Sequence, residues 1–269
     1  MSALPAGTID RRLSAPLTSR ASEEPVIALH GPRSVGKSTV LRAFAERAGS
    51  SVLDLDDPAV QAAVASNPTV AVSTPAPVCI DEYQHVIDVL DALKARLNRQ
   101  GSLPGTAVLT GSTRQDALPR TAQALTGRLH SMTIWPLSQG EIGGVEENLL
   151  ESLHHNPVAA VDAIPASTTT RAEYVDRVCA GGFPLALKRT AGASRNRWFD
   201  DYVRQSVERD AVELARIQQR EALGKLLDRL AGRTGQVLNL TNAGEGLGLS
   251  LSTLQDYATL LEDLFLIER

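Results

Sequence analysis

The chain has 269 residues, of which 43% are hydrophobic and 22% charged, so it can bury the core of one α/β domain plus a smaller partner and is not globally disordered. Lys and Arg total 27 against 31 Asp and Glu, for a net charge of -4, which argues against a wholesale nucleic-acid coat. Only two cysteines occur, Cys79 and Cys179, too few for a disulfide scaffold or a cysteine-rich zinc site.

The N-terminal twenty residues carry charges and prolines where a signal peptide needs an apolar run of about 7 to 15 residues. No stretch of the sequence reaches the roughly 18 apolar residues of a membrane span. We therefore expect a soluble protein of the cytoplasm, in a reducing compartment and without a membrane partner.

Apolar runs alternate with helical patterns from residue 26 to about residue 135, which is typical of a parallel sheet covered by helices. The predicted strands are 26–30, 52–56, 77–82, 106–112 and 130–135. The predicted helices between them are 38–49, 58–66, 86–99 and 115–125. This order predicts a three-layer α/β core over residues 1–150.

Small residues, Pro and Thr dominate residues 154–170, so we expect a linker or loop over 151–170. The strand signal then vanishes, and helices are predicted over 171–180, 196–216, 221–232, 242–246 and from a cap at Ser252 to 264. The apolar run at 265–267 predicts one further strand.

The clearest motif is GPRSVGKS at residues 31–38, which matches the phosphate loop (Walker A) GxxxxGK followed by Ser or Thr. It follows an apolar strand and opens a helix, so backbone N–H groups converge on one anion. Lys37 is expected to reach the β and γ phosphates and Ser38 to ligate Mg²⁺. The alternative is a Gly-rich turn that only caps a helix. The residues expected to bind nucleotide are Gly31, Pro32, Arg33, Ser34, Val35, Gly36, Lys37, Ser38 and Thr39.

Two carboxylates, Asp81 and Glu82, end the third predicted strand, where open α/β sheets bind ligands. This pattern (Walker B) predicts that Asp81 holds Mg²⁺ through its water shell and that Glu82 orients and polarises the attacking water. The sequence has no NKxD guanine-reading motif, which disfavours a GTPase.

Polar residues also end the fourth predicted strand. ATPases that read the γ phosphate carry an extra strand between the loop strand and the acidic strand, and Ser112 best fits the polar sensor at its tip. Arg114 and Arg128 are the candidate charge stabilisers, acting within the subunit or on a neighbour. For each arginine, a surface ion pair is the alternative.

The ordered set GPRSVGKST, VCIDEYQHV, VLTGSTR, LTGRLHSMTIWPLSQGE, GGFP and RWFDDYVRQSVERD resembles the bacterial and archaeal AAA-like ATPases that carry a C-terminal domain of unknown function. The resemblance spans roughly residues 11–269. It implies that Lys37, Ser38, Asp81, Glu82 and Ser112 match the nucleotide-site positions. It also implies a helical lid over 171–220, beginning near the GGFP motif.

Two departures from that family are visible. Its members usually continue into a further α/β domain, whereas this chain stops at Arg269, so we expect a fragment or a shortened member. The strand tip offers Ser112 where many AAA proteins place Asn, which leaves the water-positioning role there less defined.

The segment 221–269 predicts a winged helix-turn-helix. Its last helix carries one Gln, no Lys or Arg, and an acidic polar face with Asp256, Glu262 and Asp263, which would repel phosphates. This favours a protein-packing or lid-support role over direct DNA binding, and both remain open. Between Lys188 and Arg233 basic side chains exceed acidic ones, which is typical of a solvated helix surface or of a phosphate-facing one.

The sequence therefore predicts an ATPase that hydrolyses ATP with Mg²⁺ and passes a conformational change to its C-terminal half. The alternative is a nucleotide-gated binding module that presents this region to a protein or DNA partner with little turnover. A homo-oligomer is compatible with both.

Overall fold

The computed structural model describes residues 9–114, 125–211 and 219–269, which divide into two compact units. One unit contains 13–135 and 199–269, and the other contains the N-terminal residues through Arg12 together with Pro136–Trp198. The helix predicted over 115–125 falls almost entirely outside the described residues. None of the described helices is long and apolar enough to cross a membrane.

The first unit is built on a five-stranded sheet with the order β2-β3-β4-β1-β5. All the strand pairs are parallel, which confirms the predicted α/β core. The strands are β1 (Val26–His30), β2 (Val52–Asp54), β3 (Val78–Asp81), β4 (Ala107–Gly111) and β5 (Leu129–Thr133). β4 lies between β1 and β3, as predicted for the strand that carries the polar sensor.

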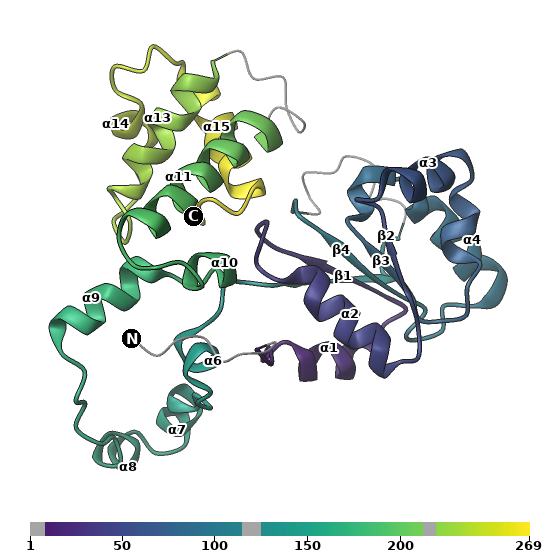
Figure 1. The fold of residues 1–269 in the computed structure, drawn as a ribbon, viewed down its shortest axis with the longest axis horizontal. Helices are drawn as coiled ribbons and strands as arrows, with labels where there is room; N and C mark the ends of the chain where they lie inside the picture. The colour runs from purple at the N-terminus through teal and green to yellow at the C-terminus, as the bar shows by residue number, and fades with distance from the viewer. Residues whose placement is uncertain (1–8, 115–124, 212–218) are drawn as a thin grey trace. The chain divides into compact units, whose positions relative to one another are not determined.

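The central strands are buried along their whole length and mostly apolar, because helices cover both faces of the sheet. Ile27 and Leu29 of β1 pack with one core cluster, together with α1 (Ser14–Ala21) and α2 (Lys37–Arg47). On the other face, Val26 packs with the core that includes α3 and α4. Figure 1 shows the strands between these two helical layers. The helices of the second layer are α3 (Pro58–Ser66), the 3-10 turns η1 (Pro68–Val72) and η2 (Tyr83–Val86), and α4 (Val89–Gln100).

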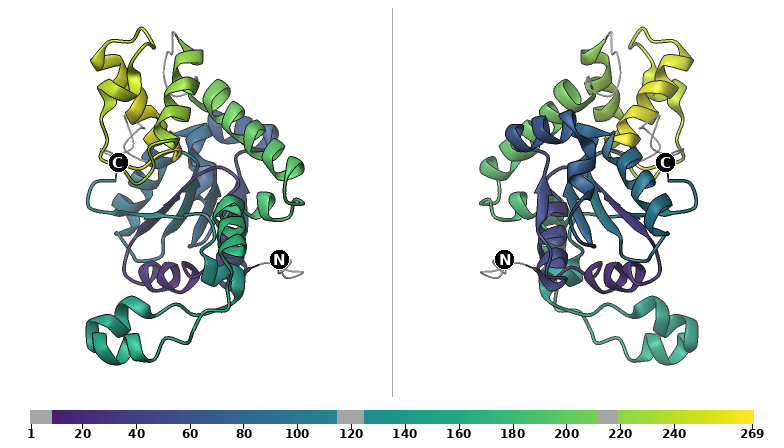
Figure 2. Two further views of the ribbon diagram at one scale, coloured as in Figure 1. Left: turned by 90° about the vertical axis from the view of Figure 1, so that its left-hand side faces the viewer. Right: turned by 90° about the vertical axis from the view of Figure 1, so that its right-hand side faces the viewer.

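The C-terminal part of this unit is helical. Apolar side chains of α13, α14 and α15, with Val207, form a separate core cluster, and these helices lie side by side in Figure 1 and Figure 2. The elements are α11 (Ala193–Gln205), which begins in the other unit, the π-helical η4 (Ser206–Asp210), α13 (Arg220–Ala231), α14 (Leu240–Gly244) and α15 (Leu251–Asp263).

The strand predicted at 265–267 is wrong. Phe265 takes a positive φ of 58°, and Leu266 donates its N–H back to Leu261 O, so the chain turns at the end of α15. Its apolar side chains join the helical core instead of a sheet. Residues 219–269 therefore contain no β-wing. The N-cap of α15 is Ser250, two residues before the predicted one, and its hydroxyl accepts the N–H of Thr253.

The second unit is also helical in its described part. Its helices are α6 (Gln139–Gly143), α7 (Leu149–His155), α8 (Pro157–Asp162), α9 (Arg171–Ala180), α10 (Pro184–Leu187) and the start of α11. The predicted loop over 154–170 is partly wrong, because Asn156 caps a short α8 whose first residue is Pro157. The proline read as a linker signal occupies the first turn of a helix, where its missing N–H costs nothing. Neither α7 nor α8 buries a residue.

Candidate nucleotide site

The phosphate loop joins β1 to α2, and its conformation depends on particular residues. Gly36 caps α2 with φ 101° and Ser34 has φ 59°, backbone angles that side chains rarely adopt. A Cβ on Gly31 would lie 2.2 Å from the backbone oxygen of Ile134, so only glycine fits there. Val35 is fully buried in the core. The loop is therefore fixed at both ends and at its centre.

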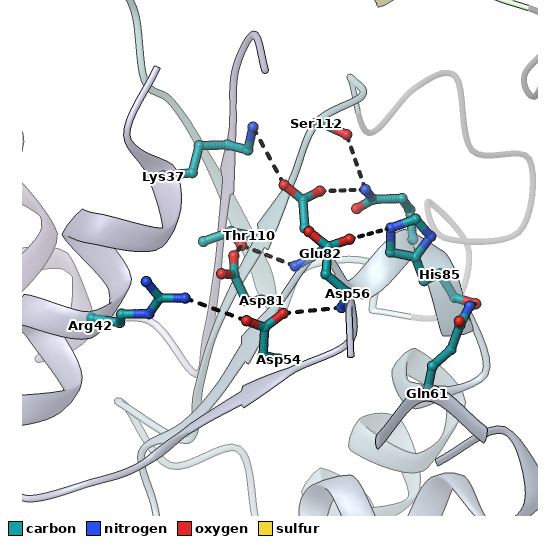
Figure 3. Close-up of polar contacts among 11 residues, drawn as sticks. Lys37, Arg42, Asp54, Asp56, Gln61, Asp81, Glu82, His85, Thr110 and Ser112 are labelled. Atoms are coloured by element: carbon teal, nitrogen blue, oxygen red, sulfur yellow. Dashed lines mark hydrogen bonds and ion pairs between the residues drawn. The ribbon is translucent and has the colours of Figure 1, made fainter. Parts of the chain in front are cut away.

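Lys37 lies within this loop at 4% exposure. Its Nζ donates to the carbonyl oxygens of Gly31 at 3.1 Å and Pro32 at 3.0 Å, and lies 3.8 Å from Glu82 Oε1. Burial lowers the pKa of Lys37, and the Glu82 carboxylate partly opposes that shift. In Figure 3 the side chains of Lys37 and Glu82 point toward one another.

Asp81 ends β3 and is 2% exposed. The hydroxyl of Thr110, on β4, donates to Asp81 Oδ1 and accepts the N–H of Glu82 at 3.2 Å. Glu82 itself has φ 51°, so the chain turns sharply after the acidic pair. One buried hydroxyl thus fixes both Asp81 and the backbone of Glu82.

Ser112 follows β4 and is 6% exposed. Its Oγ accepts a hydrogen bond from Gln84 Nε2 at 3.0 Å, and the same nitrogen donates to Glu82 Oε2 at 2.5 Å. The structure therefore brings Lys37, Asp81, Glu82 and Ser112 together at the carboxyl ends of the central strands, where α/β sheets bind ligands.

A buried histidine supports the base of the loop. His30, the last residue of β1, lies 2.9 Å from Tyr83 Oη and 3.0 Å from Ser131 Oγ through its two ring nitrogens. Burial, and then the nearby Lys37 charge, lower the pKa of His30 to about 4. The imidazole is therefore neutral at pH 7 and links β1 to β5 and to the 3-10 turn η2 through hydrogen bonds.

The remaining predicted site residues differ in position. Ser38 is half-buried and Thr39 is exposed on α2. Arg114 follows the tip of β4, where its N–H donates to Asp263 O at 3.1 Å and its guanidinium lies 5.1 Å from the centroid of the Phe265 ring.

Arg128, the second predicted charge stabiliser, lies away from the phosphate loop of its own chain. It immediately precedes β5, its carbonyl accepts the N–H of Val26 at the start of β1, and its Nη1 donates to Asn98. The phosphate loop follows the carboxyl end of β1. Arg128 and the phosphate loop therefore lie at opposite ends of the parallel strands. A role for Arg128 on a neighbouring subunit stays a prediction.

Polar residues of α2, of η2 and of the end of β2 and the turn after it lie beside this group (Figure 3). His85 Nε2 is 2.9 Å from Asp56 Oδ1, and Arg42 pairs with Asp54 at 3.3 Å. Within the described ranges no cluster of three or more His, Cys, Asp or Glu residues could hold a metal ion.

Two residues of the site were not selected from the sequence as site residues. Thr110 is one of the polar residues that end the fourth predicted strand, and Gln84 lies within the motif VCIDEYQHV. The alternation of side chains along β4 would place Thr110 and Ser112 on one face, which is the signal that could have found Thr110. No periodicity points to Gln84, because its approach depends on the left-handed turn at Glu82.

Comparisons with known proteins agree with this geometry. Residues 23–143 match the family described as an AAA domain, and residues 171–269 match a domain of unknown function (DUF8612). Uncharacterized proteins of Mycobacterium bovis and Mycobacterium tuberculosis are each 23% identical over 263 residues, which cover 97% of this chain and 53% of theirs. The chain thus spans about half the length of these curated relatives.

Among solved structures, the fold is similar to the Walker-type ATPase PABY2304 of Pyrococcus abyssi. The TM-score is 0.56 at 14% identity, and the match covers 98% of this chain and 91% of that chain. The AAA match supports nucleotide binding, and the family matches together with the shared fold confirm the resemblance found in the motifs. Residues 23–143 are thus similar to an AAA domain and residues 171–269 to a domain of unknown function, in a chain whose fold resembles that of a Walker-type ATPase.

Proposed function

We propose that this protein hydrolyses the β-γ phosphoanhydride bond of ATP with Mg²⁺ and transmits the change to its C-terminal helices. The observation that carries this proposal is the approach of Glu82 to within 3.8 Å of Lys37 at the end of a complete phosphate loop. A loop that merely capped a helix would need neither a buried lysine nor an acid facing it.

The residues present fit a Mg-nucleotide. Residues 31–39 offer the backbone cradle, and Ser38 and Asp81 offer the oxygen ligands that Mg²⁺ prefers. The ion, when bound, neutralises charge on the phosphate oxygens. Lys37 binds the β and γ phosphates, and Glu82 holds the attacking water and accepts its proton. Ser112 contacts the γ phosphate, and Arg114 is the candidate for stabilising its developing charge.

The route to the C-terminal helices is supported by the residues that follow β4 and β5. Arg114 contacts Phe265 and Asp263, and Trp135 meets Phe265 edge to face, with ring centroids 5.9 Å apart. A shift of the β4 tip on γ-phosphate release would therefore reach the end of α15.

Phosphate release and calorimetry on the same preparations test the proposal. Lys37→Ala should abolish ATP binding while the fold survives. Glu82→Gln keeps the shape and hydrogen-bonding capacity of the side chain but loses its charge, so binding should persist while turnover falls by about 10²-fold or more. Equal ATP affinity in Lys37→Ala and wild type would refute the site. Unchanged turnover in Glu82→Gln would refute the role of Glu82, and binding without turnover in wild type would leave a nucleotide-gated binding module.

A further inference from the structure

The Gln84 side chain is placed by a local backbone feature. Glu82 has a left-handed φ of 51°, and the chain then enters the 3-10 turn η2 (Tyr83–Val86). This sharp turn folds Gln84 back, so that its amide meets the carboxylate of a residue only two positions earlier.

The amide of Gln84 bridges two residues that come from different strands. Its Nε2 donates to Glu82 Oε2 at 2.5 Å and to Ser112 Oγ at 3.0 Å. An ionised carboxylate can only accept hydrogen bonds, so the nitrogen must face Glu82 and the orientation of the amide is fixed. The Glu82 side chain, at 12% exposure, is thereby held toward the tip of β4.

The other end of this amide indicates a ligand. Gln84 Oε1 is buried, and among the residues that the structure describes it has no hydrogen-bond partner. Native proteins seldom leave a buried carbonyl without a donor. A Cβ on Gly111 would lie 3.1 Å from this oxygen, so the glycine keeps its surroundings uncrowded. A water molecule beside Glu82 would supply the missing donor.

We propose that Gln84 is a positioning residue for hydrolysis. It holds the Glu82 carboxylate through one amide N–H and the Ser112 hydroxyl through the other, and its carbonyl oxygen accepts a hydrogen bond from the water whose proton passes to Glu82. The oxygen of that water forms the bond to the γ phosphorus, and the bond to the β-γ bridging oxygen breaks, with ADP as the leaving group. This inference rests on the proposed ATPase function and adds a residue to it.

Gln84→Met tests the role, because it keeps the side-chain length but removes both donors and the acceptor. Gln61→Met is the matched control: Gln61 lies on α3 and donates to His85 O at 3.4 Å, outside the hydrolytic group. We expect kcat of Gln84→Met to fall by about 10-fold or more while the KM for ATP and the affinity for ADP change by less than about 2-fold. The control should retain wild-type values.

A double-mutant cycle separates positioning from a structural role. In the Glu82→Gln background, Gln84→Met should lower kcat by no more than about 2-fold, because the group that Gln84 positions is already lost. If Gln84→Met fails to fold, Gln84→Asn, which is too short for both contacts, replaces it in the same cycle.

Three results would overturn the inference alone, given wild-type turnover: an unchanged kcat, equal losses in both backgrounds, or a parallel loss of ADP affinity. A wild-type protein that binds ATP without hydrolysing it would instead overturn the proposed function, and this inference with it.

Discussion

Thr110→Val is the substitution that best isolates the buried link between β3 and β4. Thr110 is fully buried, its hydroxyl donates to Asp81 Oδ1, and it accepts the N–H of Glu82 at 3.2 Å. Valine carries a methyl group in place of the hydroxyl and has nearly the same size, so the change removes two hydrogen bonds without opening a cavity.

The expected cost follows from the two lost contacts. A hydrogen bond to a charged acceptor contributes about 1.5–3 kcal/mol, and a buried N–H left without an acceptor costs about 1–3 kcal/mol. Because the two effects share one hydroxyl and are not additive, we expect a loss of about 3 kcal/mol for Thr110→Val. Thr110→Ser keeps the hydroxyl and loses one methyl group, for about 1 kcal/mol.

Hydrogen exchange of peptides covering β3 and β4 measures this difference directly. A gap of about 2 kcal/mol between the variants corresponds to roughly 30-fold faster exchange in Thr110→Val than in Thr110→Ser. Equal protection in the two variants would show that the hydroxyl contributes nothing, and the reasoning would be refuted.

Two further predictions concern protonation and assembly. His30 has a pKa of about 4 in the folded protein, below its value in the unfolded chain. The unfolded state therefore binds the proton first, and the free energy of unfolding decreases as pH falls from about 6.5 toward 4. In urea titrations, His30→Gln should lose less stability than wild type over this pH range, and equal losses in the two proteins would contradict the prediction. Arg128→Ala should bind ATP but hydrolyse it poorly, and mixing it with Lys37→Ala should partly restore activity. The specific activity should rise with protein concentration, and phosphate release is measured both with DNA and without it. Concentration-independent activity without rescue would exclude a role for Arg128 on a neighbouring subunit.

The sheet was predictable because each central strand carries two signals in the sequence, an apolar run and the polar residues that follow it. Each central strand is a continuous apolar run, as burial on both faces requires, and each is followed by polar residues that the chemistry needs. The helix α3 matched its predicted bounds of 58–66, since Asp57 caps it and Pro58 opens it. Polar residues that follow parallel strands meet at one end of the sheet, so the sequence alone predicts a common site for Lys37, Asp81, Glu82 and Ser112.

The errors arose where a local signal has more than one structural outcome. Pro157 is compatible with a linker and with a helix start, and the apolar run after α15 suits a strand as well as a turn into the helical core. Arg128 was selected as a charge stabiliser although it precedes its strand. In a parallel sheet, residues that precede strands lie at the opposite end from residues that follow them. Gln84 was missed because the turn that directs it depends on a single left-handed residue.

The division into compact units has a consequence for how the protein evolves and can be dissected. The two family matches suggest a cut near residues 143–171, yet residues 13–135 and 199–269 belong to one unit, and 136–198 form most of the other. The middle segment is therefore an insertion between two stretches of sequence that share one compact unit. A truncation after residue 143 would remove the Phe265 contacts of Trp135 and Arg114, so a cut at the family boundaries would separate side chains that lie in one compact unit.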